Sequence, residues 1–176
     1  MSDQDHSHSS SHPFAALARR AIESNLRGDP SPEAGAELSD HESTGVFVSI
    51  KKGGVLRGCI GTILPVTESL ADEVTQNAVS AATRDPRFPP MSPEELEQVT
   101  ISVDVLTTPE PVASPGDLDP ARYGVIVLSG PRKGVLLPDL PGIDTVQKQL
   151  GIAKQKAGIG TDEECELFRF EVKRYF

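Results

Sequence analysis

The sequence predicts an α+β fold in which an N-terminal helix precedes two related hairpin–helix–strand lobes around a cleft. Three observations predict it: apolar residues recur at helical spacing after residue 13, strand-like runs flank glycine-containing turns, and one hairpin pattern occurs twice. The chain has 176 residues, 37% of them hydrophobic, which suits one ordinary globular domain. We therefore predict a single domain over residues 13–176, preceded by a tail over residues 1–12.

The tail, MSDQDHSHSSSH, has no apolar face and is predicted to be disordered. Its three histidines leave open a loose metal site, because short His-rich tracts can bind metals. The helix is expected over residues 13–27, with Pro13 in its first turn. Residues 28–43 have the composition of a linker.

The first lobe is expected over about residues 44–107. It should contain a hairpin, a helix, a short second helix and a half-buried strand, at residues 45–60, 67–82, 92 onward and 99–105. Thr67 is expected to cap the first of these helices. Ser92 and Glu95 have the spacing of a capping box, in which each side chain accepts a hydrogen bond from the other residue's backbone.

The second lobe, over about residues 121–176, repeats this order. A hairpin is expected over 124–137, a helix over 144–157, and one closing strand that includes Phe168, Phe170 and Val172. The hairpin sequences GVFVSIKKGGVLRG and GVIVLSGPRKGVLLP are offset by about 79 residues at Gly45 and Gly124 and by about 80 at Gly54 and Gly134. This pattern predicts an internal duplication, although short hairpins also resemble one another by chance.

The chain has a net charge of −9, from 17 basic and 26 acidic residues. A protein this acidic repels the phosphate backbone, so binding to nucleic acid is disfavoured. Its apolar runs are too short to cross a membrane, and the N-terminal segment does not have the pattern of a secretory signal. We therefore expect a cytoplasmic protein in which Cys59 and Cys165 are reduced.

The segment LRGCIGT, residues 56–62, is the first candidate for a functional site. Strand alternation places Arg57 and Cys59 on one face, where the cation would favour a thiolate on Cys59 as nucleophile or redox group. Gly58 and Gly61 would let a ligand approach the backbone, or allow a bulge that re-aims the thiol. The alternative is a buried, structural cysteine.

The segment RDPRFPP, residues 84–90, is the second candidate. Arg84 and Arg87 could together bind a small phosphate or carboxylate ligand, with Asp85 orienting them or acting in catalysis. The alternative is that these residues form Arg–Asp pairs that brace a loop. Outside the tail the only histidine is His41, and no Gly-rich phosphate loop occurs, so we predict neither a metal site nor a cofactor.

LRGCIGT followed by RDPRFPP resembles the signature of the AMMECR domain family, whose bacterial members are called protein A of the AmmeMemoRadiSam system. The resemblance extends over nearly everything beyond residue 13. It implies an α+β fold of two related lobes, with Leu56 through Gly61 as the functional element. The name of the system implies a Memo-like protein and a radical SAM enzyme as partners, and the resemblance assigns no activity.

Three hypotheses follow. The chain is a Cys-dependent enzyme or enzyme subunit that acts on a small anionic metabolite, with Cys59 and Asp85 as catalytic candidates and Arg57, Gly58, Gly61, Arg84 and Arg87 as ligand-binding candidates. Alternatively, it is a nucleotide- or peptide-binding module without turnover. In the third hypothesis, the chain is a structural partner of a Memo-like protein.

Overall fold

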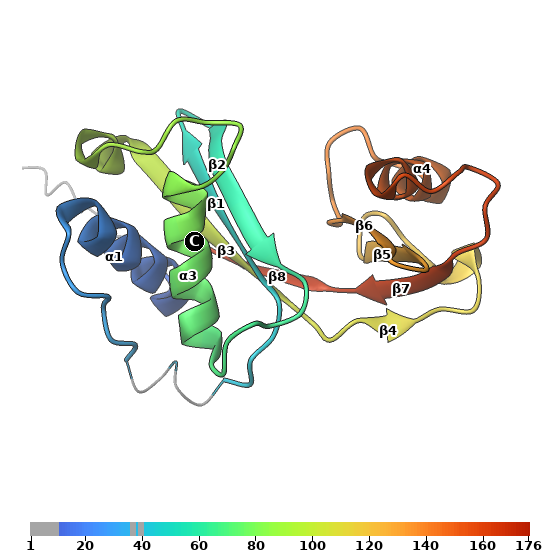
Figure 1. Cartoon of the computed structure of the whole chain (residues 1–176), viewed down its shortest axis with the longest axis horizontal. Coiled ribbons are helices and arrows are strands. Elements are labelled where there is room, and N and C mark those ends of the chain that lie inside the picture. The colour runs from blue at the N-terminus through green and yellow to red at the C-terminus, as the bar shows by residue number, and fades with distance from the viewer. Residues whose placement is uncertain (1–10, 36–37, 39–40) are drawn as a thin grey trace, which may run out of the picture. The chain divides into compact units, whose positions relative to one another are not determined.

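A computed structural model describes residues 11–35, 38 and 41–176 of the chain. These residues form two compact lobes (Figure 1). The N-terminal lobe contains the described residues up to Asp104 together with Arg174–Phe176, and the C-terminal lobe contains Val105–Lys173. These bounds lie close to the expected lobes, except that the last three residues return to the N-terminal lobe. The expected cleft stays a prediction.

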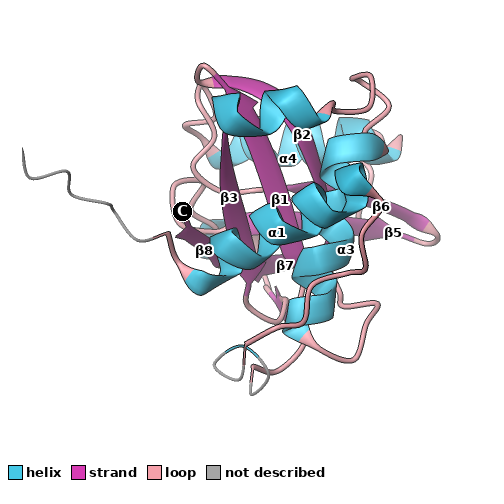
Figure 2. Ribbon diagram, turned by 90° about the vertical axis from the view of Figure 1, so that its left-hand side faces the viewer, coloured by secondary structure: helices cyan, strands magenta, loops and turns pink. Residues whose placement is uncertain are grey.

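The N-terminal lobe is a four-stranded sheet in the order β2-β1-β3-β8. Its strands are β1 (Val46–Lys52), β2 (Val55–Thr62), β3 (Val99–Leu106) and β8 (Val172–Tyr175). The helices α1 (Pro13–Arg27) and α3 (Leu70–Thr83) lie side by side over one face of this sheet (Figure 2). A 3-10 helix, η1 (Pro93–Gln98), precedes β3.

Helix α1 is capped by His12, which the sequence had assigned to the disordered tail. The His12 side chain accepts a hydrogen bond of 3.3 Å from the backbone N–H of Phe14, and the backbone N–H of His12 donates to the carbonyl of Phe176 at 2.6 Å. The folded part of the chain therefore starts earlier than expected. Residues 1–10 of the predicted tail lie outside the described residues. At its other end α1 closes on Gly28, whose φ of 75° favours glycine.

Helix α3 is capped by Ser69, which accepts a hydrogen bond from Asp72 N–H, and not by Thr67 as expected. The expectation was wrong because Thr67 has another partner: its hydroxyl donates to the Glu73 carboxylate at 2.7 Å. The capping interaction predicted at Ser92 is present, since Ser92 N–H donates to Glu95 at 3.1 Å.

The C-terminal lobe is a second four-stranded sheet, in the order β4-β7-β5-β6. Its elements are β4 (Glu110–Pro111), η2 (Pro115–Asp117), β5 (Gly124–Ser129), β6 (Arg132–Leu136), α4 (Val146–Ala157) and β7 (Glu166–Phe170). The single closing strand expected here is wrong: the chain forms β7 in one sheet and β8 in the other. Glu171 separates the two strands. Its carbonyl accepts a hydrogen bond of 3.0 Å from Thr107 N–H, and its N–H donates at 2.9 Å to the Thr107 hydroxyl, just after the end of β3.

The two lobes share their connectivity, since each hairpin is followed by a helix and by a strand that pairs with the first hairpin strand. This gives the orders β2-β1-β3 and β6-β5-β7. In each lobe the helix backbone meets a glycine of the second hairpin strand: a side chain at Gly58 would collide with the carbonyl of Ala81, and one at Gly134 with that of Ala153. Gly58 and Gly134 therefore have the same packing role in their lobes, whereas Gly54 lies in the turn of the first hairpin. The duplication itself stays a prediction.

Candidate functional site

The LRGCIG segment forms most of β2, which is an edge strand of its sheet. Ile50 of β1 pairs with Gly58, but the next residue, Lys51, pairs with Leu56. Arg57 is therefore the extra residue of a β-bulge, one of the two outcomes expected from the glycines around it. Bulges bend a strand and re-aim the side chains beside them.

Cys59 lies opposite Ser49, whose hydroxyl donates a hydrogen bond of 3.2 Å to the thiol sulfur. The thiol is half-buried. The backbone of Cys59 points away from β1: its N–H donates to Asp85 at 2.9 Å and its carbonyl accepts from Arg87 at 3.2 Å. The Ser49–Cys59 pair therefore belongs to the type without mutual backbone hydrogen bonds, in which the side chains come closer together.

Asp85 joins the two motifs. Its carboxylate is 2% exposed and accepts hydrogen bonds from Cys59 N–H and from the backbone and guanidinium of Arg87, the shortest being 2.7 Å. The Arg87 side chain lowers the pKa of Asp85 well below its usual range, although burial acts in the opposite direction. These contacts match the bracing interpretation of RDPRF.

Arg57 is held by Glu95, 38 residues later in the chain. Nε and Nη2 of Arg57 donate to the two carboxylate oxygens at 3.0 and 2.9 Å, and Lys52 lies 3.4 Å from one of them. Hydrogen bonds from Arg57 first, and then from Ser92 N–H, lower the pKa of Glu95 to about 2. The sequence had indicated only the capping role of Glu95.

Phe88 brings the two arginines together. Its ring centre lies 6.0 Å from the Arg57 guanidinium and 5.5 Å from that of Arg87, within reach of cation–π attraction. Each guanidinium is neutralised by a carboxylate, Glu95 for Arg57 and Asp85 for Arg87. Arg84 is exposed, and within the described residues its side chain has no recorded ion pair or hydrogen bond.

The two glycines of the segment have packing roles. Gly58 admits the carbonyl of Ala81 on α3, and Gly61 admits the ring of Phe47 from the neighbouring strand. Such an aromatic ring lying over a cross-strand glycine stabilises a sheet. Packing therefore accounts for both glycines, and their contact with a ligand stays a prediction.

Glu73 is a buried residue that was not predicted. Its carboxylate, 0% exposed, accepts hydrogen bonds from the hydroxyls of Thr62 and Thr67 and from the N–H groups of Val66 and Thr67. Burial raises its pKa, but these hydrogen bonds outweigh burial and the pKa is lowered. Glu73 thus fixes the loop between β2 and α3. The sequence did contain one indication that Glu73 is buried: it follows Leu70 by three residues and so lies on the apolar side of the helix.

Two further properties concern only the part of the chain that the structure describes. There, no three His, Cys, Asp or Glu side chains gather as a metal site would require. Nor does any helix in these ranges have both the length and the apolar character needed to cross a bilayer.

The fold and this site define a class of two-lobed α+β protein in which a cysteine-containing edge strand is closed by an Arg–Asp loop. The chain belongs to the AMMECR1 family, whose model matches residues 15–175. The predicted resemblance to this family is therefore confirmed.

Relatives in bacteria and archaea span nearly the whole chain. A protein of Thermotoga maritima is 49% identical over 170 residues, covering 93% of this chain and 97% of the relative. A protein of Clostridium acetobutylicum is 45% identical over 170 residues, but these are 36% of its length. The crystal structure of the uncharacterized protein PH0010 from Pyrococcus horikoshii matches with a TM-score of 0.82 and 32% identity, covering 92% of this chain and 88% of that one.

Proposed function

We propose that this chain is a protein-docking subunit, and that its partner binds the surface formed by Arg57, Cys59, Arg87 and Phe88 above the buried Asp85, here called the LRGCIG–RDPRF surface. One observation supports this above the alternatives. Arg57 and Arg87, the residues best placed to hold a small anion, are each already bonded through two nitrogens to an internal carboxylate.

A free anion that bound the Nε–Nη2 edge of either guanidinium would have to displace its carboxylate. Glu95 is 19% exposed and Asp85 is 2% exposed, so either would be left as a poorly hydrated charge. Removing one partner of a fully buried ion pair costs about 3–5 kcal/mol, and the cost is smaller here because Arg87 is 54% exposed. Binding of a docking partner avoids this free-energy cost, because the partner contacts the outer surface of the two ion pairs without breaking them.

The composition of the surface suits a protein partner. Arginine and aromatic residues are enriched among the residues that contribute most to protein–protein binding. Arg87 is 54% exposed, although its guanidinium is held by Asp85, and Phe88 is half-buried between the two arginines. Side chains that are fixed before binding lose less conformational entropy when the partner arrives.

The proposed partner is a Memo-like protein, with a radical SAM enzyme in the same system, as the family resemblance implies. The clostridial relative supports docking in general terms. The region that matches this chain is 36% of that protein, so a related domain is covalently joined to a larger polypeptide there. Fusion of this kind is typical of domains that work together.

The second candidate is a Cys-dependent enzyme or enzyme subunit that acts on a small anionic metabolite, or a nucleotide-binding module at the same place. The observation that favours it is the half-buried thiol of Cys59, which accepts a hydrogen bond from Ser49. Arg84 is the exposed cation available to an anion in this case.

Two variants distinguish the candidates. Affinity for the Memo-like protein of the same organism is measured by calorimetry, with thermal unfolding as a check on folding. If docking is the function, Phe88→Ala weakens binding at least about tenfold, as expected for a central contact. Cys59→Ser leaves the affinity unchanged. The docking proposal fails if the wild type forms no complex with the Memo-like protein. It also fails if Cys59→Ser abolishes this binding while Phe88→Ala preserves it.

A further inference from the structure

The C-terminal lobe lacks one of the helices that cover the N-terminal sheet. In the N-terminal lobe, α3 packs on β1 and β2. Beside it, Arg19 of α1 donates to the carbonyl of Val99 at the start of β3, and Phe14 of α1 contacts Tyr175 of β8. In the C-terminal lobe, α4 packs on β5 and β6, and no described helix covers β7 and β4.

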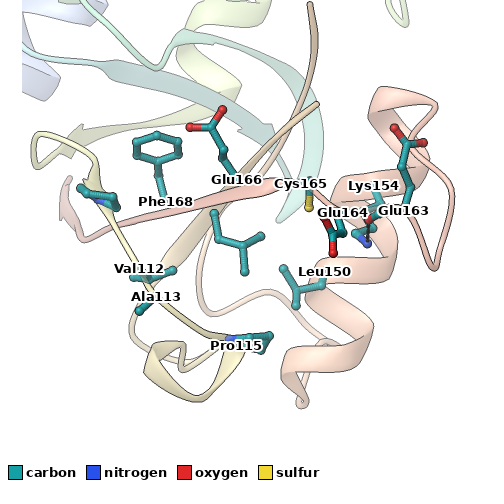
Figure 3. Close-up of a pocket in the computed structure, with 12 residues that line it drawn as sticks. Val112, Ala113, Pro115, Leu150, Lys154, Glu163, Glu164, Cys165, Glu166 and Phe168 are labelled. Atoms are coloured by element: carbon teal, nitrogen blue, oxygen red, sulfur yellow. Dashed lines mark hydrogen bonds between the residues drawn. The ribbon is translucent and has the colours of Figure 1, made fainter. Parts of the chain in front are cut away.

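A groove of about 650 Å³ lies at this uncovered position. Leu150 of α4 forms one wall, Val112 and Pro115 form the opposite wall, and Cys165 lies at one end (Figure 3). Leu167 of β7 also lines it. Leu150, Val112, Cys165 and Leu167 all pack at the margin of the hydrophobic core, and all remain half-buried. The groove therefore exposes apolar side chains to solvent.

The margin of the groove is acidic. Four of the five residues Asp162–Glu166 are acidic. Glu163 is paired with Arg132, but Glu164 and Glu166 are exposed and have no recorded partner within the described residues. Lys154, the one cation lining the groove, donates to the carbonyls of Thr161 and Glu163. The groove thus combines apolar walls with uncompensated negative charge.

We propose that this groove docks a basic, amphipathic helix of a partner protein, placed on β7 as α1 is placed on the N-terminal sheet. An apolar helix face would cover Leu150 and Leu167, and flanking lysines or arginines would meet Glu164 and, past the β7 backbone, Glu166, which strand alternation places on the face opposite Leu167. This surface lies in the other lobe and does not depend on the LRGCIG–RDPRF surface.

Residues 1–10, the longest segment outside the described residues, are not a suitable occupant. Residues 1–10 contain two aspartates, no lysine or arginine, and no apolar run. A second copy of the chain would bring another net charge of −9 to an already acidic margin. Charge complementarity therefore favours a basic segment from another protein.

The probe is a synthetic peptide as long as α1, 15 residues, with leucines on one helical face and lysines on the other. A matched peptide carries glutamates in place of the lysines. We expect the lysine peptide, but not the glutamate peptide, to bind the full chain. Its binding should slow alkylation of Cys165 and leave the alkylation rate of Cys59 unchanged. The double variant Glu164→Lys/Glu166→Lys should weaken binding about tenfold at low ionic strength.

The control variant is Glu68→Lys/Glu97→Lys, which changes the net charge equally at two exposed positions of the N-terminal lobe. It should weaken binding much less than the groove variant. Three results would each overturn the proposal: equal binding of the two peptides, equal effects of the two double variants, or binding that leaves Cys165 unprotected.

Discussion

The carboxylate of Asp85 accepts a hydrogen bond of 2.9 Å from the backbone N–H of Cys59, 26 residues earlier in the chain. Arg87, bonded to the same carboxylate, donates to the carbonyl of Cys59. Both outward backbone groups of Cys59 are thus occupied. Exposed edge strands are prone to pair with other chains, and the RDPRF loop prevents this at the centre of β2. The two motifs therefore act as one structural unit.

Replacing Asp85 should destabilise the N-terminal lobe. In Asp85→Ala the N–H of Cys59 loses its acceptor, which costs about 1–3 kcal/mol when the group is buried. Asp85→Asn should cost less, because its amide oxygen still accepts from Cys59. Urea unfolding measures the free energy of unfolding of both variants. Glu97→Ala, at an exposed position, serves as the control and should fall within about 0.5 kcal/mol of the wild type. An unaffected Asp85→Ala protein would show that the brace contributes nothing.

The Arg57–Glu95 pair should make stability depend on acid pH. The pKa of Glu95 is lowered to about 2 in the folded protein, against about 4.3 in an unfolded chain. The folded state therefore binds fewer protons, so this stabilisation is complete above the unfolded value and is lost as pH falls toward 2. Asp85, whose pKa is also lowered, acts in the same direction. Urea midpoints between pH 7 and 2.5 should fall less steeply below pH 4.5 in Glu95→Gln.

Gly58→Ala and Gly134→Ala should both destabilise the protein, because each new methyl group meets a helix carbonyl. Overpacking of this kind typically costs about 1–3 kcal/mol. Gly151→Ala is the matched control: it lies inside α4, where an added Cβ has nothing within 4 Å. That change should stabilise the helix by about 0.5–1 kcal/mol. Chemical denaturation of the three variants provides the comparison, and equal effects would refute the packing explanation.

Alkylation should report which cation influences Cys59. The sequence predicted that Arg57 would favour a thiolate on Cys59. The structure changes this expectation, because Glu95 neutralises Arg57 while Arg87 contacts the Cys59 backbone. We now expect Arg87→Leu to slow alkylation more than Arg57→Leu does, since it also leaves the Asp85 charge uncompensated. The rates at pH 7, followed by mass spectrometry, decide this. A larger effect of Arg57→Leu would contradict it.

Local patterns predicted the fold well. The two hairpins, the helices and the Ser92–Glu95 cap follow from residues close together in sequence, and the motifs LRGCIGT and RDPRFPP identified the family. The division between β7 and β8 was missed because the apolar alternation continues through Glu171 while the partner strand changes. No local pattern marks that change.

The contacts of the candidate residues were not predicted, and their role as a site stays a prediction. Phe88 lies between Arg57 and Arg87, whereas strand parity concerned only Arg57 and Cys59 and did not anticipate the bulge at Arg57. The partner of Arg57 is 38 residues away, and several other carboxylates were equally available in the sequence. Which acid pairs with which arginine depends on tertiary geometry, so the neutrality of the surface could not be foreseen.

The position of β8 has a consequence for synthesis of the protein on the ribosome. Residues 105–173 form the C-terminal lobe without interruption, whereas the N-terminal sheet needs Val172–Tyr175 for its outer strand beside β3. While the intervening residues are being translated, β3 remains an open edge, of the kind that makes nascent chains prone to aggregate. A message truncated before codon 172 would therefore yield a chain with all four strands of the second sheet and a first lobe that presents β3 to chaperones and proteases.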